Sequence, residues 1–167
     1  MTRTPDDSDH YRYVMSHYPT GVTLVTAREP DGTALGMVVG SFTSVSLRPP
    51  LVAFLPSRRS TTWPRIRVVG RFCANILGAG QDDVCRAFVG KVADRFERYE
   101  WRAAGSGSPL LCRATAWVDC EVASVVDAGD HHIVLARVRE LGVGEPAGLP
   151  LIFLHGRYLS PRRLPTP

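Results

Sequence analysis

The chain has 167 residues, of which 44% are hydrophobic and 22% are charged. This length suits one domain, and this composition excludes a disordered chain, a collagen-like repeat and a coiled coil. No apolar run approaches the roughly 18 residues that a membrane helix needs, and the polar N-terminus lacks the apolar segment of a signal peptide. We therefore expect a soluble cytoplasmic protein without membrane contact. Residues 9–160 should form one domain between a disordered tail over 1–8 and a second tail over 161–167.

The formal charge is +4, and Lys91 is the only lysine among 20 basic residues. The arginines are scattered, whereas nucleic-acid-binding proteins usually show a basic stripe with interleaved aromatic residues. We therefore expect no nucleic-acid partner. The four cysteines lack C-x-x-C spacing and the five histidines lack H-E-x-x-H spacing, so no metal site is predicted. Cys73 and Cys120 lie in alternating apolar runs and are expected to be buried free thiols.

The first predicted element is a helix that ends at Pro19, with Ser8 as its N-cap. Its apolar residues follow helical spacing: Tyr11, Val14, Met15 and Tyr18. We expect this stripe to pack against the core.

Beyond this helix the apolar residues alternate with a period of two and β-branched residues are frequent, which predicts strands. The expected strands cover residues 21–26, 34–39, 41–46, 51–55, 72–77, 115–126, 132–141 and 151–154. Two short helices interrupt them. One starts at Pro64, with Trp63 or the preceding threonine as its cap, and ends at Gly70; the other runs from Asp82 to Gly90.

Residues 91–109 are expected to form an irregular loop, and short turns join most neighbouring strands, as at Asp31-Gly32. We therefore predict a mainly β fold, an antiparallel split β-barrel with a few short helices, since closure removes exposed sheet edges. No predicted strand leads into G-x-G-x-x-G, so no Rossmann fingerprint supports a dinucleotide site.

Residues 57–64 place four hydroxyl groups and two guanidinium groups just before a predicted helix. A helix N-terminus offers N–H groups and a positive dipole end, and arginine adds forked donors that match phosphate oxygens. The stretch indicates a phosphate or diphosphate site. A capped helix with solvated arginines is the alternative that these residues leave open.

Three further stretches are candidates for a site. Residues 36–46 are small or carry hydroxyls, which lets a flat ligand approach the backbone, although a glycine-containing strand junction is also common. Neighbours on a strand point to opposite faces, so at most one of His131 and His132 should face a pocket. Considered alone, the pattern of residues 91–96 is typical of a solvated charged loop.

Taken in order, these stretches resemble the short-chain flavin reductases, the reductase components of two-component flavin-dependent monooxygenases. The resemblance runs from about Tyr11 to Tyr158. It is carried by residues 19–26 (PTGVTLVT), 36–37 (GM), 41–52 (SFTSVSLRPPLV), 71–77 (RFCANIL), 91 (K), 94–96 (DRF), 129–131 (GDH) and 156–158 (GRY).

The resemblance implies an FMN-binding split barrel that works as a homodimer, with flavin bound near the subunit interface. The implied reaction is hydride transfer from NADH or NADPH to FMN or FAD, and the reduced flavin then passes to an oxygenase component. The flavin supplies the chemistry, so no catalytic triad is required. Family members usually carry polar side chains at the positions of Val38 and Gly40. These departures favour the alternative of a split barrel that binds or converts a small molecule in a biosynthetic pathway without NAD(P)H turnover.

The resemblance also implies roles for individual residues. His131 would be catalytic, beside the nicotinamide and flavin rings. The residues implied to bind the flavin are Met37, Val38, Val39, Gly40, Ser41, Ser44 and Ser46 along the ring, Ser57, Arg58, Ser60, Thr61 and Thr62 at the phosphate, Lys91 and Arg95 at the phosphate or ribityl chain, and Tyr158 at the same cavity.

Overall fold

The computed structural model describes residues 7–144 and 148–161, which form three short helices and twelve strands. The helices are α1 (Ser8–Met15), α2 (Trp63–Val69) and α3 (Asp82–Val89). The strands are β1 (Thr20–Gly21), β2 (Thr23–Arg28), β3 (Ala34–Val39), β4 (Thr43–Leu47), β5 (Pro50–Phe54), β6 (Arg71–Ile76), β7 (Trp101–Ala103), β8 (Pro109–Leu111), β9 (Ala116–Ala128), β10 (His131–Val143), β11 (Ile152–Leu154) and β12 (Arg157–Leu159). None of the described helices is long and apolar enough to cross a membrane. Most of the two predicted tails, residues 1–6 and 162–167, lies outside the described residues.

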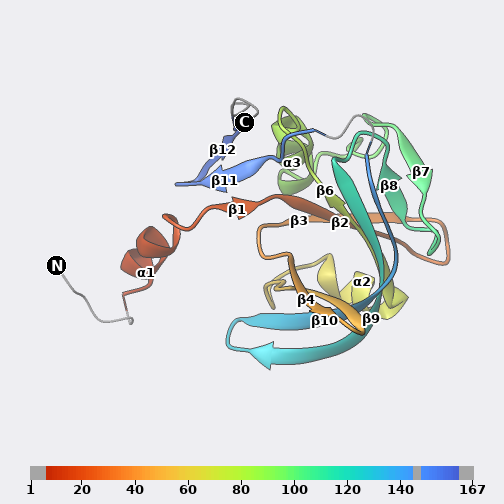
Figure 1. Ribbon diagram of the computed structural model, residues 1–167, viewed down its shortest axis with the longest axis horizontal. Coiled ribbons are helices and arrows are strands. Elements are labelled where there is room, and N and C mark those ends of the chain that lie inside the picture. The colour runs from red at the N-terminus through yellow and green to blue at the C-terminus, as the bar shows by residue number, and fades with distance from the viewer. Residues whose placement is uncertain (1–6, 145–147, 162–167) are drawn as a thin grey trace.

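Seven strands form one antiparallel sheet in the order β3-β2-β6-β9-β10-β5-β4. Two small sheets, β1-β11-β12 and β7-β8, accompany it, and the large sheet curls around α2 (Figure 1). The prediction of a mainly β, antiparallel fold is confirmed. Closure of the barrel is not shown, because β3 and β4 are the two edges of the large sheet and no pairing joins them in the described part of the chain.

The link between β3 and β4, residues 40–42, leads away from β3. It carries Ser41, whose Oγ accepts a hydrogen bond from the Leu55 N–H at 2.9 Å. This contact ties the link to the end of β5. The chain then continues into β4, which pairs with β5 instead of β3.

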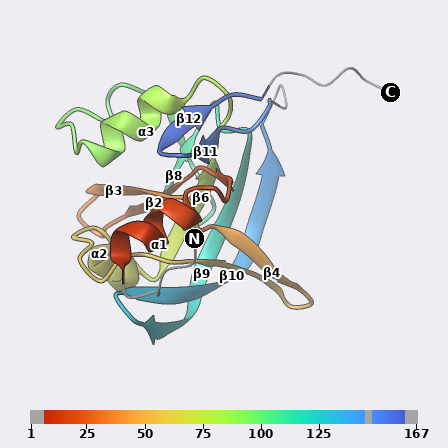
Figure 2. The same cartoon turned by 90° about the vertical axis from the view of Figure 1, so that its left-hand side faces the viewer.

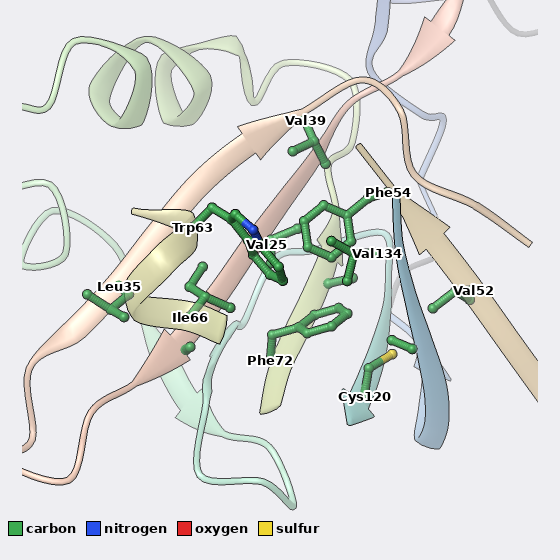
Figure 3. Packing of buried hydrophobic residues seen from close by; sticks show 13 residues of the cluster. Val25, Leu35, Val39, Val52, Phe54, Trp63, Ile66, Phe72, Cys120 and Val134 are labelled. Atoms are coloured by element: carbon green, nitrogen blue, oxygen red, sulfur yellow. The ribbon is translucent and has the colours of Figure 1, made fainter. Parts of the chain in front are cut away.

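The first core cluster fills the space between the concave face of the large sheet and α2 (Figure 3). Trp63 and Ile66 of α2 are buried there against Phe54 and Phe72. The ring centroid of Phe54 lies 5.5 Å from that of Trp63 and 5.2 Å from that of Phe72, in edge-to-face arrangements. Full burial of one such side chain contributes about 1.5–3 kcal/mol, so this cluster fixes α2 and the loop that precedes it.

A second core cluster lies on the opposite face of the sheet, under α3. Side chains of one strand alternate between the two clusters, as expected for a strand: Val25 packs in the first and Leu24 in the second. Figure 2 shows α3 close to β11 and β12, and Tyr158 of β12 packs against the second cluster. The sheet is thus covered on both sides near β2 and β3.

The region 91–109, predicted to be irregular, contributes the first strand of the β7–β8 hairpin. A buried amide anchors this hairpin: Asn75 Oδ1 accepts from the Leu111 N–H at 2.7 Å, while its Nδ2 donates to Leu24 O and to Thr26 Oγ1, both at 3.0 Å. Strands of three residues are too short to show a period in the sequence, which explains the error.

Helix α1 differs from the prediction in its cap and in its packing. Asp7, and not Ser8, is the N-cap, and its Oδ1 accepts from the N–H groups of Asp9 and His10 at 3.2 and 3.1 Å. No residue of α1 is buried, so the expected packing of its stripe against the core is wrong. Figure 1 shows α1 at the margin of the molecule.

The cysteine prediction is confirmed. Cys73 and Cys120 are buried free thiols, and burial raises the pKa of Cys120 to about 12. Neither thiol is a nucleophile at neutral pH.

Candidate functional site

The loop of residues 57–62, which joins β5 to α2, is the centre of the candidate site. Ser57 forms an isolated antiparallel bridge with His131. Further along the loop, Thr61 Oγ1 accepts a hydrogen bond from Lys91 Nζ at 2.9 Å. The 57–62 loop is therefore the point at which the turn before β10 and the end of α3 meet.

Backbone donors of the 57–62 loop are largely used inside the protein. The N–H of Arg58 donates to Asp130 O at 2.9 Å, and the N–H of Ser60 to Ser57 O at 3.0 Å. Ser60 Oγ in turn accepts from the N–H groups of Thr62 and Trp63.

The start of α2 adds little to this set of donors. Thr62 is the N-cap, one of the two predicted cap residues, and it makes no side-chain cap bond. Pro64 has no N–H, and the helix has only seven residues. The N–H groups of a helix N-terminus, on which the sequence argument relied, are therefore not the main donors here. An anion at this loop depends on side chains.

The cations near the loop differ in their partners. Arg58 Nη1 lies 3.8 Å from Asp127 Oδ2. The guanidinium of Arg95 lies 5.8 and 5.9 Å from the ring centroids of Phe88 and Phe96, within range of cation–π attraction. Arg95 also donates to Val92 O at 3.0 Å. Arg95 is thus held against aromatic rings, whereas Lys91 reaches the loop directly.

The implied ring-facing residues divide between the faces of the sheet. Met37 and Val39 of β3 pack in the first core cluster, so only their backbone is available to a ligand on the other face. Val38 faces the second cluster. Ser44 and Ser46 lie on β4, the opposite edge strand of the sheet.

Val38 and Gly40 open onto a mostly apolar cavity of about 160 Å³. Its other walls are Val22, Phe153 and Tyr158. Burial, together with the nearby Cys85 thiol, raises the pKa of Tyr158. Tyr158 therefore stays protonated in neutral solution and presents a flat ring to this cavity.

The glycine at position 40 has a packing explanation. A Cβ added there would lie 2.9 Å from Thr20 Oγ1, which is closer than such contacts normally come. The absence of a polar side chain at Gly40 follows from the close approach of β1, so this departure from the family pattern does not by itself indicate a change of ligand.

The two histidines contact different carboxylates. His131 Nδ1 lies 2.7 Å from Asp130 Oδ1, and its side chain is 42% exposed. His132 Nδ1 lies 2.9 Å from Asp127 Oδ1, and its side chain is 14% exposed. The hydrogen bond from His131 lowers the pKa of Asp130. Since Asp127 also contacts Arg58, His132 supports the 57–62 loop, while His131 remains accessible beside it.

A second and larger cavity, of about 490 Å³, was not foreseen from the sequence. It lies at the N-terminal end of α3, whereas the contact with Thr61 lies beyond the C-terminal end. Its polar walls are Gln81, Asp83, Arg98, Tyr99, Glu100 and Arg113. These residues come from three segments without a shared motif, so no local pattern could reveal the cavity.

The fold and this site define a member of the flavin reductase like domain family, whose model matches residues 15–161. The chain belongs to this family. It is 49% identical over 158 residues to a flavin reductase from Pseudomonas putida, covering 95% of this chain and 92% of that protein. It is 39% identical over 153 residues to the reductase subunit of a flavin-dependent monooxygenase from Mycobacterium tuberculosis, covering 91% of this chain and 81% of the relative.

Solved structures agree with this assignment. Component B of nitrilotriacetate monooxygenase from Mycobacterium thermoresistibile is 35% identical, with a TM-score of 0.89 over 97% of this chain and 92% of that chain. An NADH:FAD oxidoreductase from Streptomyces globisporus is 32% identical, with a TM-score of 0.89 over 98% of each chain. The resemblance drawn from the sequence motifs is confirmed.

Proposed function

We propose that this protein catalyses the reduction of free FMN or FAD by NADH or NADPH and supplies the reduced flavin to a partner monooxygenase. The observation that carries the proposal is the convergence of the 57–62 loop, Lys91 and His131. Relatives that cover most of the chain are named flavin reductases or monooxygenase reductase subunits. These names disfavour the alternative of a barrel without NAD(P)H turnover.

The residues present fit a flavin nucleotide. Hydroxyls of the 57–62 loop and the Lys91 ammonium form a donor set suited to phosphate oxygens. The apolar walls at Val38 and Tyr158 suit one face of a flat ring. When bound, the flavin accepts a hydride from a stacked nicotinamide. The protein then has to bind the flavin and the nicotinamide, orient their rings and exclude water.

His131 is proposed to orient the nicotinamide. A carboxylate only accepts hydrogen bonds, so the contact with Asp130 holds the proton on Nδ1. In the neutral ring, Nε2 is left as an acceptor that suits the N–H of a carboxamide. This arrangement fixes the orientation of a ligand and needs no change of protonation state during the reaction.

The oligomeric state and the cellular location of the protein are also proposed. We propose a cytoplasmic homodimer with the flavin near the subunit interface, supported by the exposed apolar residues of α1. The proposal includes FMN and FAD as hydride acceptors, and NADH and NADPH as hydride donors. One relative, from Agrobacterium fabrum, is named an FMN reductase (NADH), and the structure from Streptomyces globisporus is named for NADH and FAD.

The test mixes the purified protein with FMN or FAD and with NADH or NADPH, and follows the nicotinamide absorbance band. Oxidation that requires both flavin and protein is expected for at least one pair. Flavin binding without oxidation for all four pairs would contradict the proposal and favour the alternative.

A further inference from the structure

The cavity of about 490 Å³ at the N-terminal end of α3 has no part in the proposed reaction. Three segments enclose it: the start of α3 with the residues before it, residues 98–100 before β7, and the end of β8 with Arg113. None of the residues proposed to hold the flavin or the nicotinamide lines this cavity. Its volume lies in the range of small-molecule sites, so it is a separate candidate for a binding site.

Hydrogen bonds hold the walls of this cavity together. Gln81 Oε1 accepts from the Gly78 N–H at 2.6 Å, and Gln81 Nε2 donates to Arg113 O at 2.9 Å. The N–H of Cys112 donates to Glu100 O at 3.0 Å. These bonds join the start of α3 to the segment after β8, and that segment to the residue before β7. The cavity is therefore formed before any ligand binds, as is usual for small-molecule sites.

Two opposite charges in the cavity wall have no ion-pair partner. Arg98, which also lines the cavity, is paired with Asp94 at 2.9 Å. Glu100 and Arg113 form no ion pair with each other or with any other residue that the structure describes. The cavity thus offers a ligand one carboxylate that accepts hydrogen bonds and one guanidinium that donates them.

Asp83 and Tyr99 add features that suit a cation. Burial and the neighbouring Asp83 carboxylate raise the pKa of Tyr99, so its hydroxyl stays protonated and donates to Asp83. An ammonium group is attracted both by carboxylates and by the ring of a tyrosine. Asp83, Tyr99 and Glu100 all line the same cavity, so together they suit a positively charged group.

We propose that this cavity binds an α-amino acid in its zwitterionic form, with the ammonium group between Asp83 and Glu100 and the carboxylate at Arg113. A guanidinium matches a carboxylate with two parallel N–H donors. An anion alone would be repelled by two carboxylates, and a cation alone would gain nothing from Arg113. An adjoining cavity of about 410 Å³, which shares Asp83 and Tyr99, provides space for the side chain of the ligand.

The first test screens the standard amino acids at millimolar concentration for a rise in melting temperature and measures the dissociation constant of the best one by calorimetry. At least one should bind. Its decarboxylated amine and its N-acetyl derivative should each bind about tenfold more weakly or worse, because each loses one charge-assisted contact. No binding by any amino acid, or undiminished binding by either analogue, overturns the inference.

The second test locates the site. Arg113→Gln and Glu100→Gln should each raise the dissociation constant of that amino acid about tenfold or more. Arg67→Gln and Glu97→Gln are the matched controls, since both residues are exposed and line neither cavity; their dissociation constants should stay near wild type. Folded cavity variants with wild-type affinity, or equal weakening in the controls, would show that the amino acid does not bind here.

A competition experiment separates this site from the flavin site. Saturating FMN should change the dissociation constant of the amino acid by less than about twofold, because the two sets of residues do not overlap. Displacement of the amino acid by FMN would contradict a separate site. A protein that binds the amino acid but no flavin would lose the proposed function and keep this site.

Discussion

His131 and His132 begin the same strand but contact different carboxylates. His131 is the more exposed of the two and bridges to Ser57, whereas His132 is largely buried against Asp127. Adjacent residues of a strand point to opposite faces, so a single ligand can contact only one of these rings. This geometry gives His131 access to the site and His132 a supporting position.

Replacing His131 with alanine should lower NAD(P)H oxidation strongly, because misplacement of reacting rings by about 1 Å costs on the order of a hundredfold in rate. Flavin affinity should stay within a few-fold. His132→Ala should change neither rate nor affinity much. Steady-state kinetics with paired flavin titrations test this. A His131→Ala enzyme with unchanged turnover and unchanged nicotinamide KM would show that the assignment is wrong.

At the scale of elements, the β7–β8 hairpin depends on Asn75. Asn75→Leu removes the acceptor of the Leu111 N–H and leaves that donor buried, which costs about 1–3 kcal/mol besides the lost bonds to Leu24 and Thr26. We expect the free energy of unfolding, measured with urea, to fall by at least about 2 kcal/mol.

Gln81→Leu is the control for this change. Its amide makes similar bonds, accepting from the Gly78 N–H and donating to Arg113 O, but it is less buried than Asn75. Water can replace lost partners there, so the loss of stability should be smaller. Equal losses for the Asn75 and Gln81 variants would mean that burial of Asn75 does not set its contribution.

Helix α1 carries an apolar face that the described part of the chain leaves exposed. Tyr11, Tyr13, Val14 and Met15 are between 47% and 64% exposed, and Tyr18 just beyond the helix is 67% exposed. Single-chain proteins rarely leave a large contiguous apolar patch in water. The face is therefore expected to be buried against a second copy.

Replacing Tyr11 and Tyr18 together with serine should shift the protein from dimer to monomer, measured as molar mass by light scattering at micromolar concentration. Val68→Ser is the control, because Val68 on α2 is 88% exposed and belongs to another surface. A wild-type protein that is already monomeric, or a double variant that remains dimeric, would contradict this role of α1.

At the scale of the whole molecule, the flavin should behave as a released substrate. The apolar cavity is small, and Val38 and Gly40 offer no side-chain hydrogen bond to a ring. Each neutral hydrogen bond contributes about 0.5–1.5 kcal/mol, so the lack of two corresponds to roughly ten- to a hundredfold weaker binding. The purified protein should be colourless or pale. Stoichiometric flavin that survives extensive dialysis would overturn this expectation.

Much of the fold could be predicted from local pattern. Alternation with a period of two located most of the strands of the large sheet, and the ordered motifs were sufficient to identify the family. Pro64 and Gly70 marked the region of α2 correctly. These features are local because side-chain alternation and turn chemistry depend on residues only a few positions apart.

The tertiary structure alone decided the rest. It showed that most backbone donors of the 57–62 loop are used within the protein, that Lys91 takes the left-handed position after α3, and that no residue of α1 is buried. The first two depend on partners distant in the sequence, Asp130 for the loop and Thr61 for Lys91. The exposure of α1 depends on how the described elements pack around it. A pattern of neighbouring residues indicates which groups are able to form hydrogen bonds or pack. Only the folded chain determines which of these contacts are made.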